Sequence, residues 1–285
     1  MAEIIDGKLV SSVIRAKLAE EIACFKSEHE ITPGLAVVIV GDNPASLVYV
    51  RNKKRACEQV GINSYEIALP DSVSESELLE QIEILNSDPS VHGILVQLPL
   101  PKHINEETVI NAISPEKDVD AFHPANVGRI MIGNYTFLPC TPAGIIDLLD
   151  YYNIDISGKK CVVVGRSNIV GKPMAHLLLE RNGTVTVCHS RTANLIEETK
   201  GADILVVAIG KPEFIKGDMI KPGAVVIDVG INRDSTGKLI GDVDFSSASN
   251  IASYITPVPG GVGPMTITTL LKNTLNAAKT TALKK

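Results

Sequence analysis

The stretch "VVVGRSNIVGKPMAHLLL", residues 162–179, decides the fold of the second half of the chain. It contains a run of valines, a turn that begins at Gly165 and a helical segment, which is the order found in a dinucleotide-binding unit. In such units the backbone N–H groups at the start of the helix bind a diphosphate. The turn departs from the usual G-x-G-x-x-G pattern, because Ser167 stands at the second glycine position and the next glycine is Gly171. The stretch predicts a Rossmann-type unit, and a tight turn that serves only helix packing is the alternative.

A phosphate-binding P-loop is excluded for this turn on two counts. Five residues separate Gly165 from Gly171 where a P-loop has four. Pro173 follows Lys172 where a P-loop has the Ser or Thr that holds magnesium.

The end of the next expected strand predicts which nucleotide binds, because an Asp or Glu about 20 residues after the turn would bind the ribose hydroxyls of NAD. The chain reads "VCHSRT" there, residues 187–192, and has no acid. Ser190 and Arg191 can instead bind a 2′-phosphate, and Arg166 in the turn can join them. We therefore expect NADP, with Arg191 as a solvated loop residue as the alternative. The candidate cofactor-binding residues are Gly165, Arg166, Ser167, Ser190, Arg191 and Ile231.

Strand and helix signals alternate along the whole chain, which predicts an α/β fold with parallel sheets. At 285 residues the chain is long enough for two domains. We place an N-terminal αβ domain at residues 1–138 and a Rossmann-type NADP-binding domain at residues 139–265, and we expect the last helix, 266–285, to pack back on the first domain. The expected strands lie at residues 33–42, 61–70, 91–101, 161–165, 184–189, 203–210 and 224–231, and a further segment follows at 253–266.

The composition excludes several classes of protein. The net charge of −6 argues against nucleic acid as a partner, since phosphate binding needs a basic surface. Charged residues interrupt the first 22 residues, so no signal peptide is expected, and no apolar run approaches the roughly 18 residues of a membrane span. The five cysteines lack Cys-x-x-Cys and metal-ligand spacing. They predict reduced thiols in the cytoplasm, and we expect no metal site.

A basic run, "SLVYVRNKKRAC" at residues 46–57, is not a single positive patch. On an α-helix with Tyr49 set at 0°, Lys53 lies at roughly 40°, within the apolar stripe of the helix. The other cations fall between roughly 140° and 240°, on an ordinary solvated face. These cations are Arg51, Lys54 and Arg55.

Lys53 is therefore a candidate acid–base residue. An amine among apolar neighbours loses hydration, which lowers its pKa toward the range in which a lysine can exchange protons. Tyr49 precedes it by one helical turn, so phenol and amine can approach each other. The alternative is a lysine that extends along the stripe to water. Gln97 is a second unusual residue, because an amide within a Val/Leu strand needs hydrogen-bond partners.

Further motifs occur in a specific order along almost the whole chain. They are "PASLVYVRNKKRACEQVGI", "GILVQLPLP", "PEKDVDAFHPANVG", "PCTPAG", "GRSNIVGKP" and "ITPVPGGVGPMT". Together they resemble the bifunctional methylenetetrahydrofolate dehydrogenase/methenyltetrahydrofolate cyclohydrolase family. The resemblance implies NADP-dependent oxidation of 5,10-methylenetetrahydrofolate to the methenyl form and hydrolysis to 10-formyltetrahydrofolate, in one cleft between two domains. It also implies a homodimer joined through the cofactor domains.

The resemblance implies roles for individual residues of the first domain, which would then bind folate. Lys53 would be the acid–base residue of the cyclohydrolase step, with Tyr49 stacked or hydrogen-bonded beside it. Gln97 would hydrogen-bond Lys53, and Val96 and Leu98 flank it in the substrate site.

Two further segments would contact the folate. Asp120 would accept hydrogen bonds from the pterin N–H and amino groups. The family usually has glycine where this chain has Ala121, so a positive φ at that position would require the Asp120 loop to adjust. The glycine-rich segment would bring bare backbone against the folate. It consists of Pro259, Gly260, Gly261, Val262 and Gly263. The alternatives are that Asp120 caps a loop beside Asp118 and that the glycine segment is only a turn.

Two rival functions remain open on these residues. A monofunctional NAD(P)-dependent methylenetetrahydrofolate dehydrogenase would use Lys53 only to position substrate. A catalytically inactive NADP-binding module would bind NADPH and leave folates unchanged, but it gives no reason for Tyr49, Lys53 and Gln97 to converge.

Overall fold

The computed structural model describes residues 1–283, apart from the side chain of Ala45, and these residues form two compact units. The six-stranded unit contains residues 1–12 and 141–266. The three-stranded unit contains residues 13–140 and the chain from residue 267 onward. The units differ from the expected domains at the N-terminus, where the first twelve residues lie in the six-stranded unit because Glu3–Ile4 pairs with Tyr254–Ile255.

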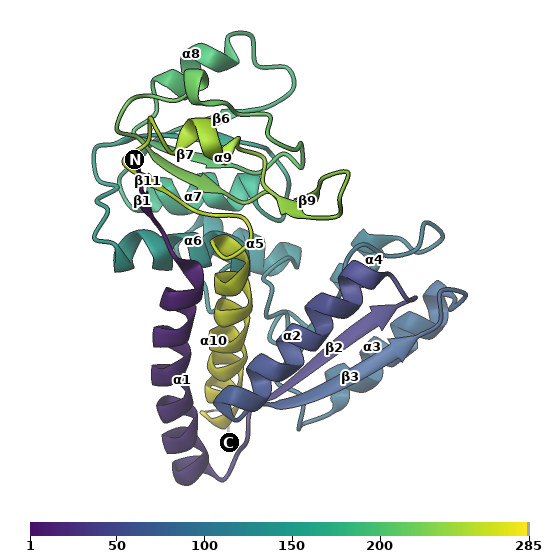
Figure 1. Ribbon diagram of the computed structural model, residues 1–285. Coiled ribbons are helices and arrows are strands. Elements are labelled where there is room, and N and C mark those ends of the chain that lie inside the picture. The colour runs from purple at the N-terminus through teal and green to yellow at the C-terminus, as the bar shows by residue number, and fades with distance from the viewer. Residues whose placement is uncertain (284–285) are drawn as a thin grey trace. The chain divides into compact units, whose positions relative to one another are not determined.

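The six-stranded unit is built on an entirely parallel sheet (Figure 1). Its strands are β1 (Glu3–Ile4), β5 (Lys160–Val164), β6 (Thr184–Cys188), β7 (Ile204–Val207), β8 (Val225–Asp228) and β11 (Tyr254–Ile255), in the order β1-β11-β8-β7-β5-β6. Because β6 lies on one side of β5 and β7 on the other, the strand order reverses at β5. Ligands of such sheets bind outside the carboxyl ends of the strands at this reversal.

Helices and a small hairpin connect these strands. They are α6 (Cys140–Tyr151), α7 (Gly171–Glu180), α8 (Leu195–Lys200), the 3-10 helix η1 (Gly217–Met219), α9 (Phe245–Ala248) and the antiparallel pair β9 (Asn232–Arg233) and β10 (Leu239–Ile240). Strand β1 is held partly by Tyr152, whose hydroxyl accepts from the Asp6 N–H at 2.8 Å and donates to the Ile4 carbonyl at 3.1 Å. Neither β1 nor the hairpin was expected, because two-residue strands are too short to show a period.

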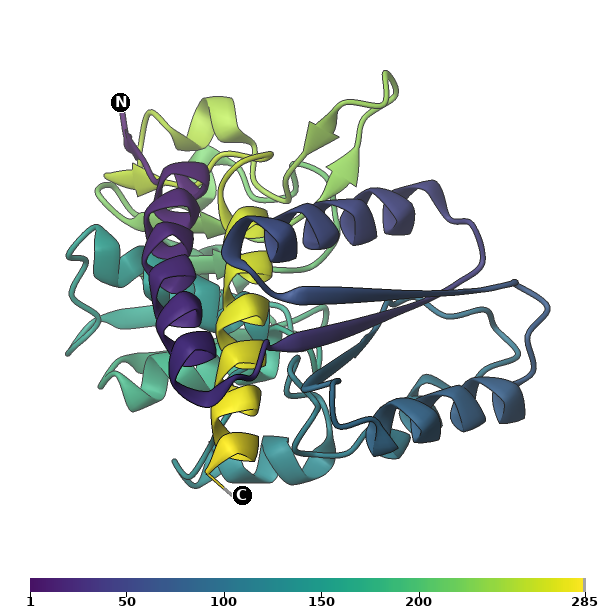
Figure 2. The same cartoon turned by 90° about the horizontal axis from the view of Figure 1, so that it is seen from below.

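The three-stranded unit has a parallel sheet of order β3-β2-β4. The alternate residues of β2 enter two separate cores, one with Leu35 and Ile39 and the other with Ala36 and Val38. Helices α1, α2 and α10 pack in the first core and α3 and α4 in the second, and Figure 2 shows α2 and α3 on opposite sides of the strands. The elements are α1 (Gly7–His29), β2 (Gly34–Val40), α2 (Pro44–Val60), β3 (Asn63–Leu69), α3 (Glu75–Ser87), β4 (Gly93–Val96), α4 (Glu106–Ala112), α5 (Pro124–Met131) and α10 (Val262–Ala282).

Helices α1 and α10 run side by side in the same direction within the three-stranded unit. The Arg15 guanidinium donates to the Thr268 hydroxyl at 2.9 Å, and Glu21 pairs with Lys279 further along both helices. Helix α10 therefore packs against α1 in this unit.

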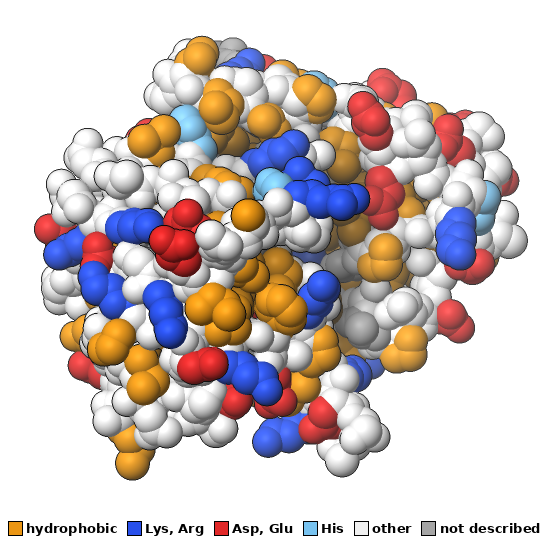
Figure 3. Space-filling view, turned by 90° about the horizontal axis from the view of Figure 1, so that it is seen from above, with side chains coloured by type: hydrophobic (Ala, Val, Ile, Leu, Met, Phe, Trp, Pro, Cys, Tyr) orange, Lys and Arg blue, Asp and Glu red, His pale blue; other side chains and the backbone are white. Residues whose placement is uncertain are grey.

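The surface is mixed in charge. On the face drawn in Figure 3, lysine and arginine side chains are interspersed with acidic and apolar ones. Among residues 1–283, no helix combines the length and apolar character that a membrane span requires.

Candidate active site

Lys53 is buried on α2, with only 8% of its surface exposed. Its neighbours on the inward stripe, Ala56, Cys57 and Val60, are buried as well, whereas the other cations of the basic run are exposed. The helical-wheel prediction for the basic run is therefore confirmed. Burial lowers the pKa of Lys53, and the negative charge of Asp120 opposes this effect. The site thus favours an amine that can lose its proton more readily than a surface lysine.

Gln97 is the hydrogen-bond partner of that amine. The Lys53 Nζ donates to the Gln97 Oε1 at 2.9 Å, and the Gln97 Nε2 donates to the Leu98 carbonyl at 2.8 Å. The backbone N–H of Gln97 donates to the Val38 carbonyl of β2 at 2.8 Å, so the residue continues the strand pairing just beyond β4. The Leu98 carbonyl thus holds the nitrogen of the side-chain amide, and the amide oxygen faces Lys53. Val96, Leu98 and Tyr49 are all half-buried.

Asp120 reaches the same end of the sheet because the chain before it lies along β4. Ile94 bridges Asp118, and the Ile94 N–H donates to the Lys117 carbonyl at 2.8 Å. Asp118 is buried and caps the loop: its carboxylate accepts from the backbone N–H groups of Phe122 and His123 at 3.2 and 2.8 Å.

The neighbouring Asn126 completes this cap, since its Nδ2 donates to Asp118 and to the Pro115 carbonyl, both at 2.8 Å. The loop-capping role that was an alternative for Asp120 therefore belongs to Asp118. Asp120 itself is half-buried.

Ala121 has a φ of 58°, in the left-handed region that favours glycine. Its N–H donates to the Asp118 carbonyl at 3.1 Å, which closes a tight turn around Asp120. The chain therefore keeps the glycine-like backbone at this position with an alanine, whose methyl group is fully buried. The loop does not need to adopt another conformation.

Asn273 and Cys140 were not predicted from the sequence, and both hold this turn. The Asn273 Nδ2 donates to the carbonyls of Val119 and Leu138, each at 2.8 Å. Burial raises the pKa of the Cys140 thiol well above its usual value, and the charge of Asp120 and a hydrogen bond with it act in the same direction. The thiol is therefore a neutral neighbour of the Asp120 carboxylate.

The turn after β5 needs glycine for packing. Gly165 has a φ of 133°, and a Cβ there would lie 2.2 Å from the Ala208 carbonyl oxygen, while a Cβ on Gly171 would lie 2.3 Å from the Gly165 oxygen. Ser167 stands where the usual pattern has its second glycine. Its Oγ accepts from the N–H groups of Val170 and Gly171, each at 3.2 Å, and so ties the turn to the start of α7. The turn packs tightly against the end of β7 and leads directly into α7, whose first N–H groups are satisfied within the turn by Ser167.

The end of β6 lies beside this turn, because β5 and β6 are paired with Val164 opposite Cys188. Ser190, Arg191 and Arg166 are all exposed. The Arg191 N–H donates to the His189 Nδ1 at 3.1 Å, which orders the backbone of the loop. The residues present fit a nucleotide with a 2′-phosphate, since no carboxylate stands at this strand end. Ile231 is exposed in the segment after β8.

The glycine segment is a turn that leads into α10, and it packs closely against the start of α1. A Cβ on Gly7 would lie 1.7 Å from the Gly261 carbonyl oxygen, and the Lys8 N–H donates to the Gly260 carbonyl at 3.2 Å. Pro259 is exposed. Val262 is buried, and a Cβ on Gly263 would meet nothing within 4 Å. A Cβ on Gly261 would lie 2.7 Å from the Pro257 carbonyl oxygen, so packing within the six-stranded unit accounts for this glycine as well as for Gly7.

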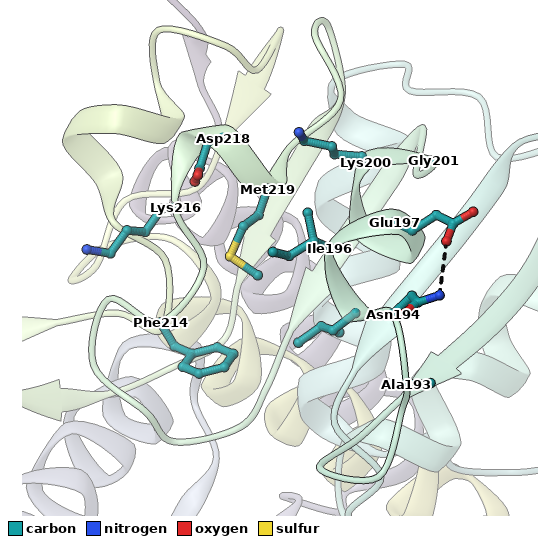
Figure 4. A pocket seen from close by; sticks show the side chains of 11 residues that line it. Ala193, Asn194, Ile196, Glu197, Lys200, Gly201, Phe214, Lys216, Asp218 and Met219 are labelled. Carbon is teal, nitrogen blue, oxygen red and sulfur yellow. Dashed lines mark hydrogen bonds between the residues drawn. The ribbon is translucent and has the colours of Figure 1, made fainter.

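A separate groove lies beside α8 and η1 and contains none of the predicted site residues. Figure 4 shows Ile196, Met219 and Phe214 around it, with the Asn194 amide bonded to Glu197 at 3.3 Å. Within residues 1–283, no group of three or more His, Cys, Asp or Glu side chains is arranged to hold a metal ion.

A six-stranded parallel sheet with a Rossmann-type turn, together with a second α/β unit that buries a lysine against an amide, defines a two-domain α/β protein of the dinucleotide-binding class. Residues 5–120 match the family model for the tetrahydrofolate dehydrogenase/cyclohydrolase catalytic domain, and residues 139–282 match that for its NAD(P)-binding domain. The chain belongs to the tetrahydrofolate dehydrogenase/cyclohydrolase family.

Relatives and solved structures agree with this assignment. The Bifunctional protein FolD of Acetivibrio thermocellus is 64% identical over 284 residues, covering 100% of this chain and 99% of that protein. The methylenetetrahydrofolate dehydrogenase/cyclohydrolase FolD of Campylobacter jejuni is 50% identical with a TM-score of 0.96, over 98% of this chain and 99% of that one. The Trypanosoma brucei enzyme, solved with NADP and an inhibitor, is 41% identical with a TM-score of 0.94, over 98% of each chain.

The family models and the relatives confirm the expected function. The chain is a bifunctional enzyme of one-carbon metabolism that oxidises 5,10-methylenetetrahydrofolate and hydrolyses 5,10-methenyltetrahydrofolate. The monofunctional and inactive alternatives are set aside.

Proposed function

We propose that Lys53 is the acid–base residue of the hydrolytic step. The observation that carries this proposal is the buried amine 2.9 Å from the Gln97 Oε1. Hydrolysis forms a bond between water and the cationic carbon that joins N5 and N10, and then breaks the bond from that carbon to N5. Both protons of the water leave its oxygen in the overall reaction: one is balanced by the proton that N5 receives, and the other is released to solvent as the adduct's hydroxyl becomes the formyl oxygen. A lysine of lowered pKa can accept a proton from the attacking water and donate one to N5.

Gln97 positions the amine and Tyr49 forms part of the substrate surface. An amide oxygen carries no charge, so it orients the Lys53 Nζ without the strong stabilisation of the ammonium form that a carboxylate would give. Val96 and Leu98, which flank Gln97 in the chain, supply apolar surface to the substrate site. Asp120 contributes a negative charge that attracts the cationic methenyl substrate.

Asp120 binds the pterin, because the two oxygens of its carboxylate can accept a pair of hydrogen bonds from the pterin N–H and amino groups. Its half-buried position and the assignment of the cap to Asp118 support this role. The glycine segment contributes backbone surface through Pro259, Gly260, Gly261 and Gly263, and Val262 supports it from the core.

NADP supplies the hydride acceptor for the methylene carbon when it is bound. The turn at Gly165, Arg166 and Ser167 contacts the diphosphate just before α7, since the N–H groups of Val170 and Gly171 at the helix start already donate to the Ser167 Oγ. Arg166, Ser190 and Arg191 bind the 2′-phosphate, and Ile231 contributes apolar surface after β8.

The remaining proposals concern assembly and location. We propose a homodimer joined through the NADP-binding domains, which sedimentation of the purified enzyme would detect as twice the mass of the chain. We also propose a cytoplasmic location, which fits the five free thiols among the described residues and which cell fractionation would test.

Lys53→Met is expected to reduce methenyltetrahydrofolate hydrolysis by about 10²- to 10⁴-fold, because the apolar stem still packs but cannot transfer protons. The measurement is the decay of methenyl absorbance in the absence of nucleotide. Lys54→Met is the matched control, since Lys54 is exposed and contacts Glu66 only at 4.0 Å. Equal losses in both variants would show that the basic run acts through its charge alone.

Asp120→Asn is expected to weaken folate binding by about 1.5 to 3 kcal/mol, since an amide offers one acceptor where the pterin needs two. Calorimetric titration of a stable folate analogue measures this, with NADP affinity unchanged. The control is Ala121→Gly, which keeps the left-handed backbone and should leave the folate dissociation constant unchanged. A folate affinity unaffected by Asp120→Asn would contradict the pterin assignment.

The double variant Arg166→Ala, Arg191→Ala is expected to weaken NADP binding by about 3 kcal/mol or more, because two charge-assisted contacts to the 2′-phosphate are lost. NAD binding should change by less than about 1 kcal/mol, since NAD lacks that phosphate and uses the diphosphate contacts alone. Titration of both nucleotides at one fixed salt concentration makes the comparison. Parallel losses for NADP and NAD, or a wild-type preference for NAD, would refute the assignment.

A further inference from the structure

Two buried carboxylates lie behind the loops that follow β7 and β8, outside the candidate site residues. Asp242 is 0% exposed and Asp228 is 3% exposed. A buried carboxylate is costly unless donors surround it, so two of them in one place need an explanation. Apolar packing around the sheet gives no reason for an acid at either position.

Asp242 binds the backbone of the loop after β7. Its Oδ2 accepts from the N–H groups of Ile209 and Gly210 at 2.7 and 2.9 Å, and its Oδ1 accepts from the Asn232 Nδ2 at 2.8 Å. One side chain thus joins the end of β7 to the first residue of the β9–β10 hairpin.

Asp228 in turn holds Asp242 in place. Its Oδ1 accepts from the N–H groups of Gly230 and Asp242, both at 2.9 Å, and its Oδ2 accepts from the Val243 N–H at 2.9 Å. Burial raises the pKa of Asp228 to about 6, although these three donors act against the rise. Above that pH the carboxylate is ionised and accepts hydrogen bonds from all three N–H groups.

The two carboxylates also account for two glycines. A Cβ on Gly230 would lie 2.3 Å from the Asp242 carboxyl carbon, and a Cβ on Gly241 would lie 1.8 Å from the Asp228 Oδ2. The chain therefore keeps bare backbone where each carboxylate approaches. The sequences "DVG" at 228–230 and "GDV" at 241–243 therefore pack against each other, with each glycine facing the carboxylate of the other segment.

The loops held in this way stand where a dinucleotide would bind. The strand order reverses at β5, so the loop after β7 is the neighbour of the turn at Gly165, which packs against Ala208. Ile231 follows Gly230 directly, so the same carboxylates set the start of the segment that carries it.

We propose that Asp242, held by Asp228, is a positioning residue that fixes the loops after β7 and β8 for nicotinamide dinucleotide binding. Asp242 is fully buried, so it acts through the backbone of Ile209 and Gly210. This inference rests on the proposed NADP site but is independent of the 2′-phosphate. Its effect should therefore be the same for NADP and NAD, unlike that of Arg166 and Arg191.

The test compares Asp242→Leu with Asp234→Leu, a matched control. Asp234 also accepts three hydrogen bonds, from the Thr236 N–H and hydroxyl and from the Lys238 N–H, but all lie within the hairpin loop. Calorimetric titration should show the dissociation constants of NADP and NAD raised by the same factor, about tenfold or more, in Asp242→Leu. Asp234→Leu should leave both within about twofold.

A second set of variants exchanges the acid and the amide between positions 242 and 232. It keeps the test decisive if Asp242→Leu does not fold. Asn232→Asp alone sets two carboxylates against each other and should weaken both nucleotides. Adding Asp242→Asn should restore binding, because the new amide can donate to the carboxylate introduced at position 232 and still accept from the N–H groups of Ile209 and Gly210. Nucleotide-free methenyl hydrolysis should stay within about twofold of wild type in every folded variant, because Lys53 and Gln97 lie in the other unit.

Four results would overturn the inference. They are unchanged nucleotide affinity in Asp242→Leu, failure of the exchanged pair to recover binding, losses of hydrolysis as large as those of nucleotide binding, and a loss confined to NADP. Wild-type enzyme that binds neither nucleotide would instead contradict the proposed NADP site, so the two failures are distinguishable.

Discussion

The burial of one lysine amine within hydrogen-bond reach of an amide is the constraint on which the three-stranded unit depends. Lys53 loses water on an inward helix face, and the Gln97 Oε1 at 2.9 Å is the polar partner that makes this burial tolerable. Gln97 can serve only because its backbone is tied to Val38 of the central strand. The apolar cores on both faces of the sheet hold helix α2, strand β2 and the end of β4 in the arrangement that brings this amine to this amide.

Buried carboxylates organise the loops in both units, while the side chains that we propose to bind ligands there are half-buried or exposed. Asp118 binds backbone N–H groups and so leaves Asp120, two residues later, available. Asp228 and Asp242 bind backbone N–H groups in the same way behind the loops that follow β7 and β8. In each case a carboxylate in low dielectric is stabilised by several N–H donors, and the loop cannot move without leaving those donors or that charge unpaired. Rigid loops of this kind hold binding groups in position before a ligand arrives.

The features that depend on local period were predictable from the residues themselves, whereas contacts between distant residues were not, and the Lys53–Gln97 hydrogen bond was expected only from the family resemblance. The inward position of Lys53 follows from helix geometry, and the turn at Gly165 follows from valines before it and a helix after it. The division of roles between Asp118 and Asp120 does not, because it is decided by Asn126 and by backbone groups that only the folded loop brings near. The same is true of Asn273, which lies 154 residues from the Val119 carbonyl that it binds. Asp228 was not predicted either, although an acid that ends an apolar run, as in "VVIDVG", is a signal from which a buried carboxylate could have been inferred.

Ala121 shows how such a network can hold an unfavourable backbone. A left-handed conformation costs a residue with a Cβ roughly 1 to 2 kcal/mol relative to the right-handed one. Here the turn is fixed from several sides, by the Asp118 carboxylate, by the Ala121 N–H and by Asn273 on α10. Each of these bonds contributes about 0.5 to 1.5 kcal/mol, so together they outweigh the strain. The alanine methyl group is also buried in the core, a gain that glycine would lack. Asp120 can therefore keep its position although the usual glycine is absent, because the loop is determined by its buried neighbours and not by the freedom of one residue.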